Sequence, residues 1–196
     1  MIINTPCRLG LKGSVVVTVK DKHGNILRSA KPNTVIVDSN RILLAQLIPS
    51  SLASDIGTIP KAGRPTVSVS NTGPTNANSI AYLRLGYTTG DTVPEGASVS
   101  QTDISMVASN IVTLKIEDAA VSSDSITFTT SISVTSGIAS RKYFEAALYT
   151  AGIGNESIPT SPNTSSMIMF AHQVHSLISA PEGATITYDW TITIPE

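Results

Sequence analysis

The chain has 196 residues, of which 14% are charged, and its formal net charge is −1. This length suits one domain with its own hydrophobic core, and the balanced charge excludes the strongly basic surface that attracts nucleic acid or anionic membranes. Cys7 is the single cysteine, which excludes an internal disulfide and a thiolate metal cluster.

Sparse charge also protects a free monomer poorly against association, so the composition favours a protein that works inside an assembly. Residues 1–10 lack the basic start and the apolar run of a signal peptide. No segment has the roughly 18 apolar residues of a membrane-spanning helix. We therefore expect a protein that is made in the cytoplasm and does not span a membrane.

The N-terminal part of the chain predicts a β-hairpin followed by a short strand. Residues 13–20 are rich in β-branched side chains, and the turn-forming run 21–25 separates them from the strand at 26–29. A further short strand is expected at 34–37.

One helix is predicted, at residues 39–48. Asp38 or Ser39 can cap its first amides, and Pro49 ends it. Its apolar residues are expected to cover an edge or an end of the β core, and they are Leu43, Leu44, Leu47 and Ile48.

The middle of the chain alternates between polar loops and strands. A long loop excursion rich in Ser, Gly, Pro and Asn is expected at about 49–78, with one edge strand expected in it at 65–70. Residues 80–85 alternate in polarity and predict a strand that Gly86 ends.

After a second polar loop at 86–100, two further strands are expected at 110–117 and 125–134. They are predicted to form a long antiparallel pair, with residues 118–124 as the connection between them.

The C-terminal third carries the two clearest strand patterns. Residues 143–149 are almost continuously apolar, which is typical of a central strand covered on both faces. A loop at 150–166 and a strand at 167–174 follow. Residues 184–194 alternate at every position, so that one face is apolar and the other is Thr and Asp. The apolar face consists of Ala184, Ile186, Tyr188, Trp190, Ile192 and Ile194.

About eight to ten strands and one helix, without an internal repeat, predict an all-β fold. The specific expectation is an antiparallel β-sandwich of jelly-roll type, forming a single domain over residues 1–196.

The histidines give no convincing metal site. His172 and His175 would point to opposite faces of a strand, and no third ligand has suitable spacing, so polar edge residues are favoured over metal ligands. His23 lies in a predicted turn and is expected to be solvated.

Glu145 is the most interesting acidic residue, because a carboxylate inside an apolar run must find hydrogen-bond donors if it is buried. It is either a general acid or base, or a structural acceptor for a neighbouring loop. The structural role is favoured, because no second carboxylate has an obvious place beside it, as glycosidase chemistry requires. Asp103, Asp118 and Asp124 lie in turn-like segments and form no set.

Other functional motifs are equally weak. There is no nucleophile elbow, phosphate-binding glycine loop or Ser/His/Asp set that can be placed on structure. The glycosylation sequons at Asn155 and Asn163 are attributed to chance. Tyr188 and Trp190 share the apolar face of the last strand, so they are predicted to be core rather than a sugar-stacking platform. The sequence thus predicts no catalytic, metal-binding or cofactor-binding residue.

An ordered series of segments nevertheless resembles one group of proteins. The segments are Gly10–Val19, Asp21–Asn25, Asp38–Ala45, Tyr82–Gly86, Glu145–Tyr149, Phe170–His172 and Asp189–Ile194. Together they resemble tailed-bacteriophage virion structural proteins of the β-sandwich type. The resemblance runs through most of the chain and is interrupted by the long insertion at about 49–78.

The resemblance implies a non-enzymatic virion subunit that assembles through strand edges and loops, with copies of itself and other virion proteins as partners. The tail or adsorption apparatus is slightly favoured over a head decoration (cement) protein. Two other classes stay open: a carbohydrate-binding module that recognises a host surface glycan, and a hydrolase centred on Glu145. Neither nucleic acid nor a membrane is an expected partner.

Overall fold

The computed structural model describes residues 11–32, 35–36, 80–99, 105–122, 125–150 and 167–193, and these residues form ten β-strands and no helix. The strands are β1 (Lys12–Lys20), β2 (Ile26–Ala30), β3 (Val35–Ile36), β4 (Ile80–Thr88), β5 (Asn110–Lys115), β6 (Asp118–Val121), β7 (Ser125–Ser133), β8 (Lys142–Thr150), β9 (Met169–Ile178) and β10 (Thr185–Thr193).

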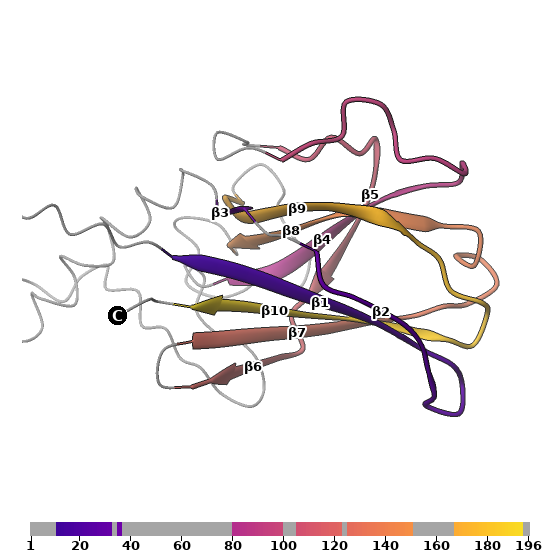
Figure 1. The fold of residues 1–196 in the computed structure, drawn as a ribbon, viewed down its shortest axis with the longest axis horizontal. Coiled ribbons are helices and arrows are strands. Elements are labelled where there is room, and N and C mark those ends of the chain that lie inside the picture. Colours follow the sequence, from indigo (N-terminus) through magenta and orange to yellow (C-terminus); the bar gives the residue numbers. More distant parts are fainter. Residues whose placement is uncertain are drawn as a thin grey trace, which may run out of the picture.

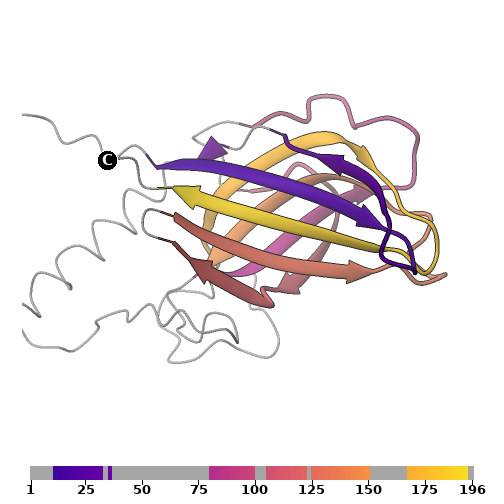
Figure 2. The same ribbon diagram turned by 60° about the horizontal axis from the view of Figure 1, so that its bottom comes forward.

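The strands form two five-stranded sheets, and every pair of neighbouring strands is antiparallel (Figure 1). The first sheet has the order β2-β1-β10-β7-β6, and the second has the order β3-β9-β8-β4-β5. In Figure 2, β1, β10, β7 and β6 of the first sheet lie side by side. The predicted all-β, antiparallel class is confirmed.

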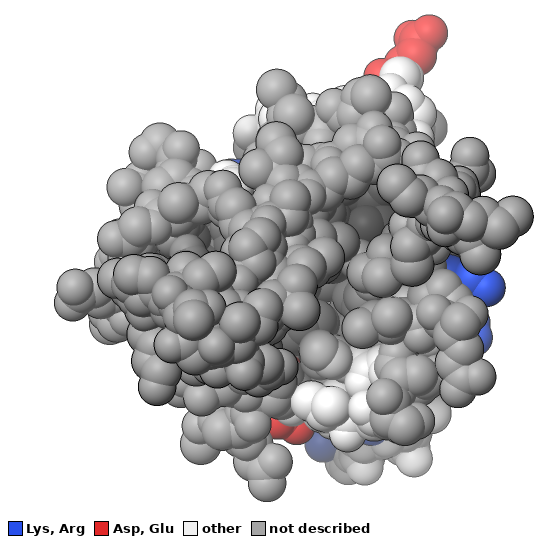
Figure 3. All heavy atoms as spheres, turned by 90° about the vertical axis from the view of Figure 1, so that its left-hand side faces the viewer, with Lys and Arg blue, Asp and Glu red and all other residues white. Residues whose placement is uncertain are grey.

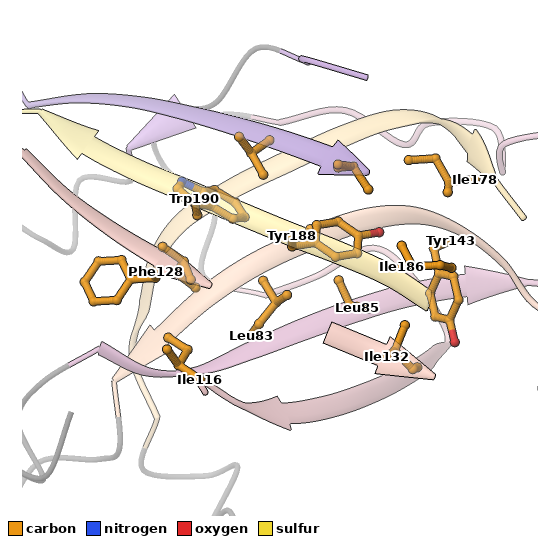
Figure 4. Close-up of a cluster of buried hydrophobic side chains, with 14 of the residues drawn as sticks. Leu83, Leu85, Ile116, Phe128, Ile132, Tyr143, Ile178, Ile186, Tyr188 and Trp190 are labelled. Atoms are coloured by element: carbon orange, nitrogen blue, oxygen red, sulfur yellow. The ribbon is translucent and has the colours of Figure 1, made fainter. Parts of the chain in front are cut away.

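The two sheets bury one shared cluster of apolar side chains (Figure 4). Tyr188 and Trp190 enter it from the first sheet, and Leu83, Leu85 and Tyr143 enter it from the second. Burying one such side chain contributes roughly 1.5 to 3 kcal/mol before the entropy of ordering is subtracted. A single strand cannot obtain this gain alone, which is why two apolar faces come together.

The alternating closing segment forms β10, in the middle of the first sheet. Its residues Ile186, Tyr188, Trp190 and Ile192 are buried in the shared core, as predicted. The opposite face of the strand forms polar cross-strand pairs with β7. Thr127 and Thr191 hydroxyls lie 2.8 Å apart, and the Thr129 hydroxyl donates to Asp189 over 2.7 Å. These hydrogen bonds give the polar side chains on this face of the sheet their partners and stabilise the pairing of β7 with β10.

The predicted N-terminal hairpin is present as β1 and β2. The Asp21 carboxylate accepts hydrogen bonds from the backbone N–H groups of His23 and Asn25 and from the Asn25 side chain. The hydrogen bond from the Asn25 side chain is the largest cause that lowers the pKa of Asp21. Gly24 has a φ of 86°, a left-handed backbone conformation that residues other than glycine rarely adopt. His23 is exposed, as expected for the turn.

The predicted antiparallel pair of residues 110–117 and 125–134 is wrong. Strand β5 pairs with β4 in the second sheet, whereas β7 pairs with β10 and β6 in the first. The reason is that residues 118–121, expected as a connection, are themselves extended and pair with β7. The buried Ile116 lies where the chain crosses from one sheet to the other. Asp118 is accordingly a strand residue and not a turn residue.

The prediction that Gly86 ends its strand is also wrong, because β4 continues to Thr88. Gly86 lies opposite Glu145 of β8 and Ile111 of β5. A glycine inside a strand usually marks close approach by another group, and here that group is the segment around Ala108.

The predictions for 143–149 and 167–174 are confirmed as β8 and β9, with β9 extending to Ile178. β8 is buried along almost its whole length and lies between β9 and β4, as a central strand should. The predicted helix at 39–48 and the excursion at 49–78 lie outside the described residues. So do the loop 151–166, Cys7, Asp103, Asp124, Asn155 and Asn163.

Candidate functional site

Glu145 is the centre of the most distinctive polar site in the described part of the chain. Ala146 and Leu148 of β8 belong to the shared core, so Glu145 and Ala147 project from the other face of the second sheet. The Glu145 side chain is nevertheless 0% exposed. A charged group buried so fully is stable only if its oxygens find partners.

Both carboxylate oxygens of Glu145 have such partners. The backbone N–H of Val107 donates to Oε1 and that of Ala108 donates to Oε2, each over 2.7 Å. Two consecutive amides of the segment between β4 and β5 therefore hold the carboxylate from one side. This contact ties residues 105–109 to the face of the second sheet.

His172 of β9 supplies a third contact, with its Nε2 2.6 Å from Oε1 of Glu145. His172 is also 0% exposed. An ionised carboxylate can only accept hydrogen bonds, so in this contact Nε2 carries the hydrogen and donates a hydrogen bond to Oε1. The site is thus a buried carboxylate–imidazole pair combined with a backbone clamp.

Gly86 makes room for this arrangement. A Cβ atom at position 86 would lie 2.4 Å from the Ala108 Cβ and 2.8 Å from Glu145 Oε2. Both distances are shorter than carbon and oxygen atoms tolerate, so any side chain here must displace the clamp or the carboxylate.

Replacing Gly86 with alanine is therefore expected to destabilise the fold by about 1 to 3 kcal/mol, the usual cost of overpacking. Chemical denaturation followed by circular dichroism measures the change. Gly137→Ala is the matched control, because a Cβ at position 137 meets nothing within 4 Å. The double variant Gly86→Ala/Ala108→Gly should recover part of the loss. Equal stability of Gly86→Ala and Gly137→Ala would contradict the close packing.

His175 lies on the other side of β9 from His172. Its Nδ1–H donates to the Ser176 carbonyl over 2.8 Å, and its Nε2 lies 3.5 Å from the Tyr188 hydroxyl of the first sheet. Burial lowers the pKa of His175, which favours its neutral form. The prediction that the two histidines face opposite ways is confirmed, but the interpretation of them as polar edge residues is wrong. Both are buried: His172 lies against Glu145, where β3 pairs with β9, and His175 lies between β9 and Tyr188 of the first sheet.

The chemistry available to the Glu145–His172 pair follows from this geometry. A carboxylate–imidazole pair can orient a general base, but a base must reach the proton that it removes. Both side chains are fully buried, and the carboxylate oxygens are occupied by the clamp. The arrangement is that of a structural acceptor, the role favoured for Glu145 from the sequence. Within the described residues, no group of three His, Cys, Asp or Glu residues could hold a metal ion.

The aromatic residues offer no sugar-stacking platform. Every Phe, Tyr and Trp of the sequence lies within the described ranges, and all are buried except Tyr87, which is half-buried. Arg141 lies over the Tyr87 ring, 4.5 Å from its centroid, and Arg84 lies 5.1 Å from that of Tyr149. The exposed rings on which the carbohydrate-binding hypothesis depended are therefore absent from these positions.

In the end-on view of Figure 3, the described Lys, Arg, Asp and Glu side chains that can be seen lie toward the margin of the outline. Across the described residues, no helix has the length and hydropathy that crossing a bilayer demands.

The sequence missed two features of this site. It did not pair His172 with Glu145, although a histidine in the strand next to a buried glutamate is the natural donor. It also did not identify residues 106–108 as a cover, although Met106-Val-Ala is an apolar run inside a polar loop.

Comparison with known proteins adds no further assignment: the chain matches no family model, no curated protein and no solved structure.

Proposed function

We propose that this chain is a structural subunit of a tailed-phage virion, in which the two sheets form a non-enzymatic β-sandwich that assembles through its strand edges and loops. The jelly-roll connectivity and the helix at 39–48 belong to the same proposal. So does a position in the tail or adsorption apparatus, which is favoured over head decoration. The ordered series of sequence segments described above is the starting point.

The observation that carries the proposal is the exposure of large apolar side chains on the outermost strands of the first sheet. On β2, Ile26 is 64% and Leu27 is 52% exposed, and on β6 Val121 is 59% exposed. Edge strands of soluble proteins are normally protected against pairing with another chain, and large exposed apolar side chains are unusual on them. The exposed apolar side chains at both edges of the first sheet support the proposal that other chains bind there.

The buried Glu145 site supports the same proposal from another direction. The most distinctive polar cluster in the described residues stabilises the fold instead of facing a substrate. An assembly subunit needs such internal anchoring and no accessible catalytic group. Many weak edge contacts on a symmetric particle add up to firm attachment, so no single dominant contact residue is required.

The copy number of this chain in gradient-purified particles, relative to the major coat protein, tests the proposal. We expect a small number of copies, because a tail, neck or fibre component is present in few copies. A ratio close to that of the coat protein would instead indicate head decoration. Complete absence from purified particles would overturn the virion proposal.

A matched pair of variants connects the copy number to the edge strands. The double variant Ile26→Ser/Leu27→Ser should enter particles less well than the unaltered chain. Val107→Ser changes a side chain that is 46% exposed but lies away from the sheet edges, and it should enter normally. Equal entry of both variants would show that β2 is not a contact.

A further inference from the structure

The two edges of the first sheet carry opposite charge. Around β2, four exposed basic side chains lie on or beside the hairpin. Of the acidic residues there, Asp21 uses its carboxylate in the turn, and the exposed Glu182 precedes Gly183, which lies beside Lys22 at the turn and not at Lys31. These basic residues, here named the basic edge, are Lys20, Lys22, Arg28 and Lys31. At the other edge, the exposed Glu117 precedes β6 and the exposed Asp118 begins it; these two residues are here named the acidic edge. Lys115, at the end of β5, is the nearest described cation in sequence.

The register of the strands places one residue from each edge near the ends of the same row. Asp118 lies opposite Thr129, which lies opposite Asp189, which lies opposite Val16. Val17 lies opposite Ala30, the last residue of β2, and the exposed Lys31 follows it directly. Lys31 and Asp118 therefore lie near the two ends of one row across the first sheet.

The two edges also run in the same direction. All the strand pairs between β2 and β6 are antiparallel, and four such steps separate these strands, so β2 and β6 are parallel to each other. Copies related by rotation about an axis along the strands would thus bring β2 of one copy beside β6 of the next. No reversal of the strand direction is needed to bring the end of β2, where Lys31 lies, close to Asp118 at the start of β6.

From this register we infer that the partner at these edges is a second copy of the chain, bound head to tail, with the basic edge of one copy against the acidic edge of the next. This inference deepens the proposed function by naming the partner and the contact. The contact joins two different surfaces, so a pair of copies still has one free basic edge and one free acidic edge. Further copies can bind there, which builds a ring or a filament. Strand β6 suits such a contact, because it pairs with β7 without a bulge.

Arg28 is not available for the same role. Its guanidinium donates to the Leu177 carbonyl over 2.8 Å and to the Ser176 hydroxyl over 3.1 Å, and so it ties β2 to the end of β9. The bulge between Val19 and Lys20 also disturbs the regular pairing of β2 near Leu27. Lys31 lies beyond both features, at the other end of β2, which makes it the sharper residue to test.

Sedimentation velocity of the full chain over a wide concentration range tests the inference. The unaltered chain should form oligomers larger than dimers. Lys31→Glu or Asp118→Lys alone places like charges together, and each should weaken association about tenfold or more. The double variant Lys31→Glu/Asp118→Lys should restore it, because the pair is reversed and not removed. Lys12→Glu, a change of equal charge on β1 of the same sheet, should have little effect.

A chain that stays monomeric throughout would overturn the inference. The same holds if the double variant fails to restore association, or if Lys12→Glu weakens it as much as Lys31→Glu. Circular dichroism of each variant separates lost association from lost folding. The outcome is independent of the copy-number experiment. A chain found in particles but monomeric in solution would leave the virion proposal standing without this contact, and a self-associating chain absent from particles would do the reverse.

Discussion

Replacing Trp190 with alanine is expected to lower the free energy of unfolding by about 3 to 5 kcal/mol. Trp190 is 1% exposed and lies between Val15 of β1 and Phe128 of β7 in the register of the first sheet. Its ring fills the space between the two sheets (Figure 4), so truncation leaves a cavity that the neighbouring side chains cannot close. Urea denaturation followed by circular dichroism measures the change, since the variant has no tryptophan to follow by fluorescence.

Trp190→Phe is the matched control. Among the described residues, the indole Nε1 of Trp190 has no hydrogen-bond partner, so phenylalanine gives up volume but no hydrogen bond. We expect Trp190→Phe to cost clearly less than Trp190→Ala, because it removes fewer buried atoms and leaves a smaller cavity. If Trp190→Ala kept the stability of the unaltered chain, the ring would be a surface group, and the carbohydrate-binding hypothesis would regain its strongest residue.

Replacing Glu145 with alanine is expected to have a comparable effect, about 3 to 5 kcal/mol, for an electrostatic reason. The change removes the acceptor of three donors: the buried N–H of Ala108, the part-buried N–H of Val107 and the buried Nε2 of His172. Each unsatisfied donor costs about 1 to 3 kcal/mol. Denaturation gives the stability. Amide hydrogen exchange at Val107 and Ala108 reports the clamp directly, and protection of both amides should be lost.

Two further variants separate the contributions at this site. Glu145→Gln keeps the size of the side chain but replaces one acceptor oxygen with an NH2 group, which faces a donor of the clamp or of His172. We therefore expect at least one of the two amides to lose its protection in this variant. His172→Ala removes one donor and leaves the clamp, so it should be less harmful than Glu145→Ala. Retained protection in Glu145→Ala would contradict the structural role. Loss of a measured turnover in a well-folded Glu145→Gln would instead identify Glu145 as catalytic.

Local patterns in the sequence were sufficient where a strand has two unlike faces. Along β10, the alternation of Ile, Tyr and Trp with Thr assigns each side chain to the core or to the polar face, because successive side chains of a strand point in opposite directions. For β8, the continuous apolar run indicated burial on both sides. The same run indicated that Glu145 must find donors, and the amides of Val107 and Ala108 provide them.

The errors have a common physical origin, which is that pairing between strands is set by distant residues. Nothing local in Asp118–Val121 shows that it pairs with β7, and without that strand residues 110–117 and 125–134 look like one hairpin. Gly86 resembles a strand terminator until Ala108 and Glu145 are known to lie against it. His172 resembles an edge residue until β3 is found beside β9.

The sequence alone therefore determined the all-β class, the inward face of the closing strand, the burial of the central strand and the need of a buried Glu145 for hydrogen-bond donors. Each of these depends on the polarity of neighbouring residues along one strand. Only the tertiary structure decided the order of strands in the sheets, the pairing of Glu145 with His172, and the row near whose ends Lys31 and Asp118 lie. These depend on contacts between segments far apart in the chain, whose free energy arises only when the two sheets have come together.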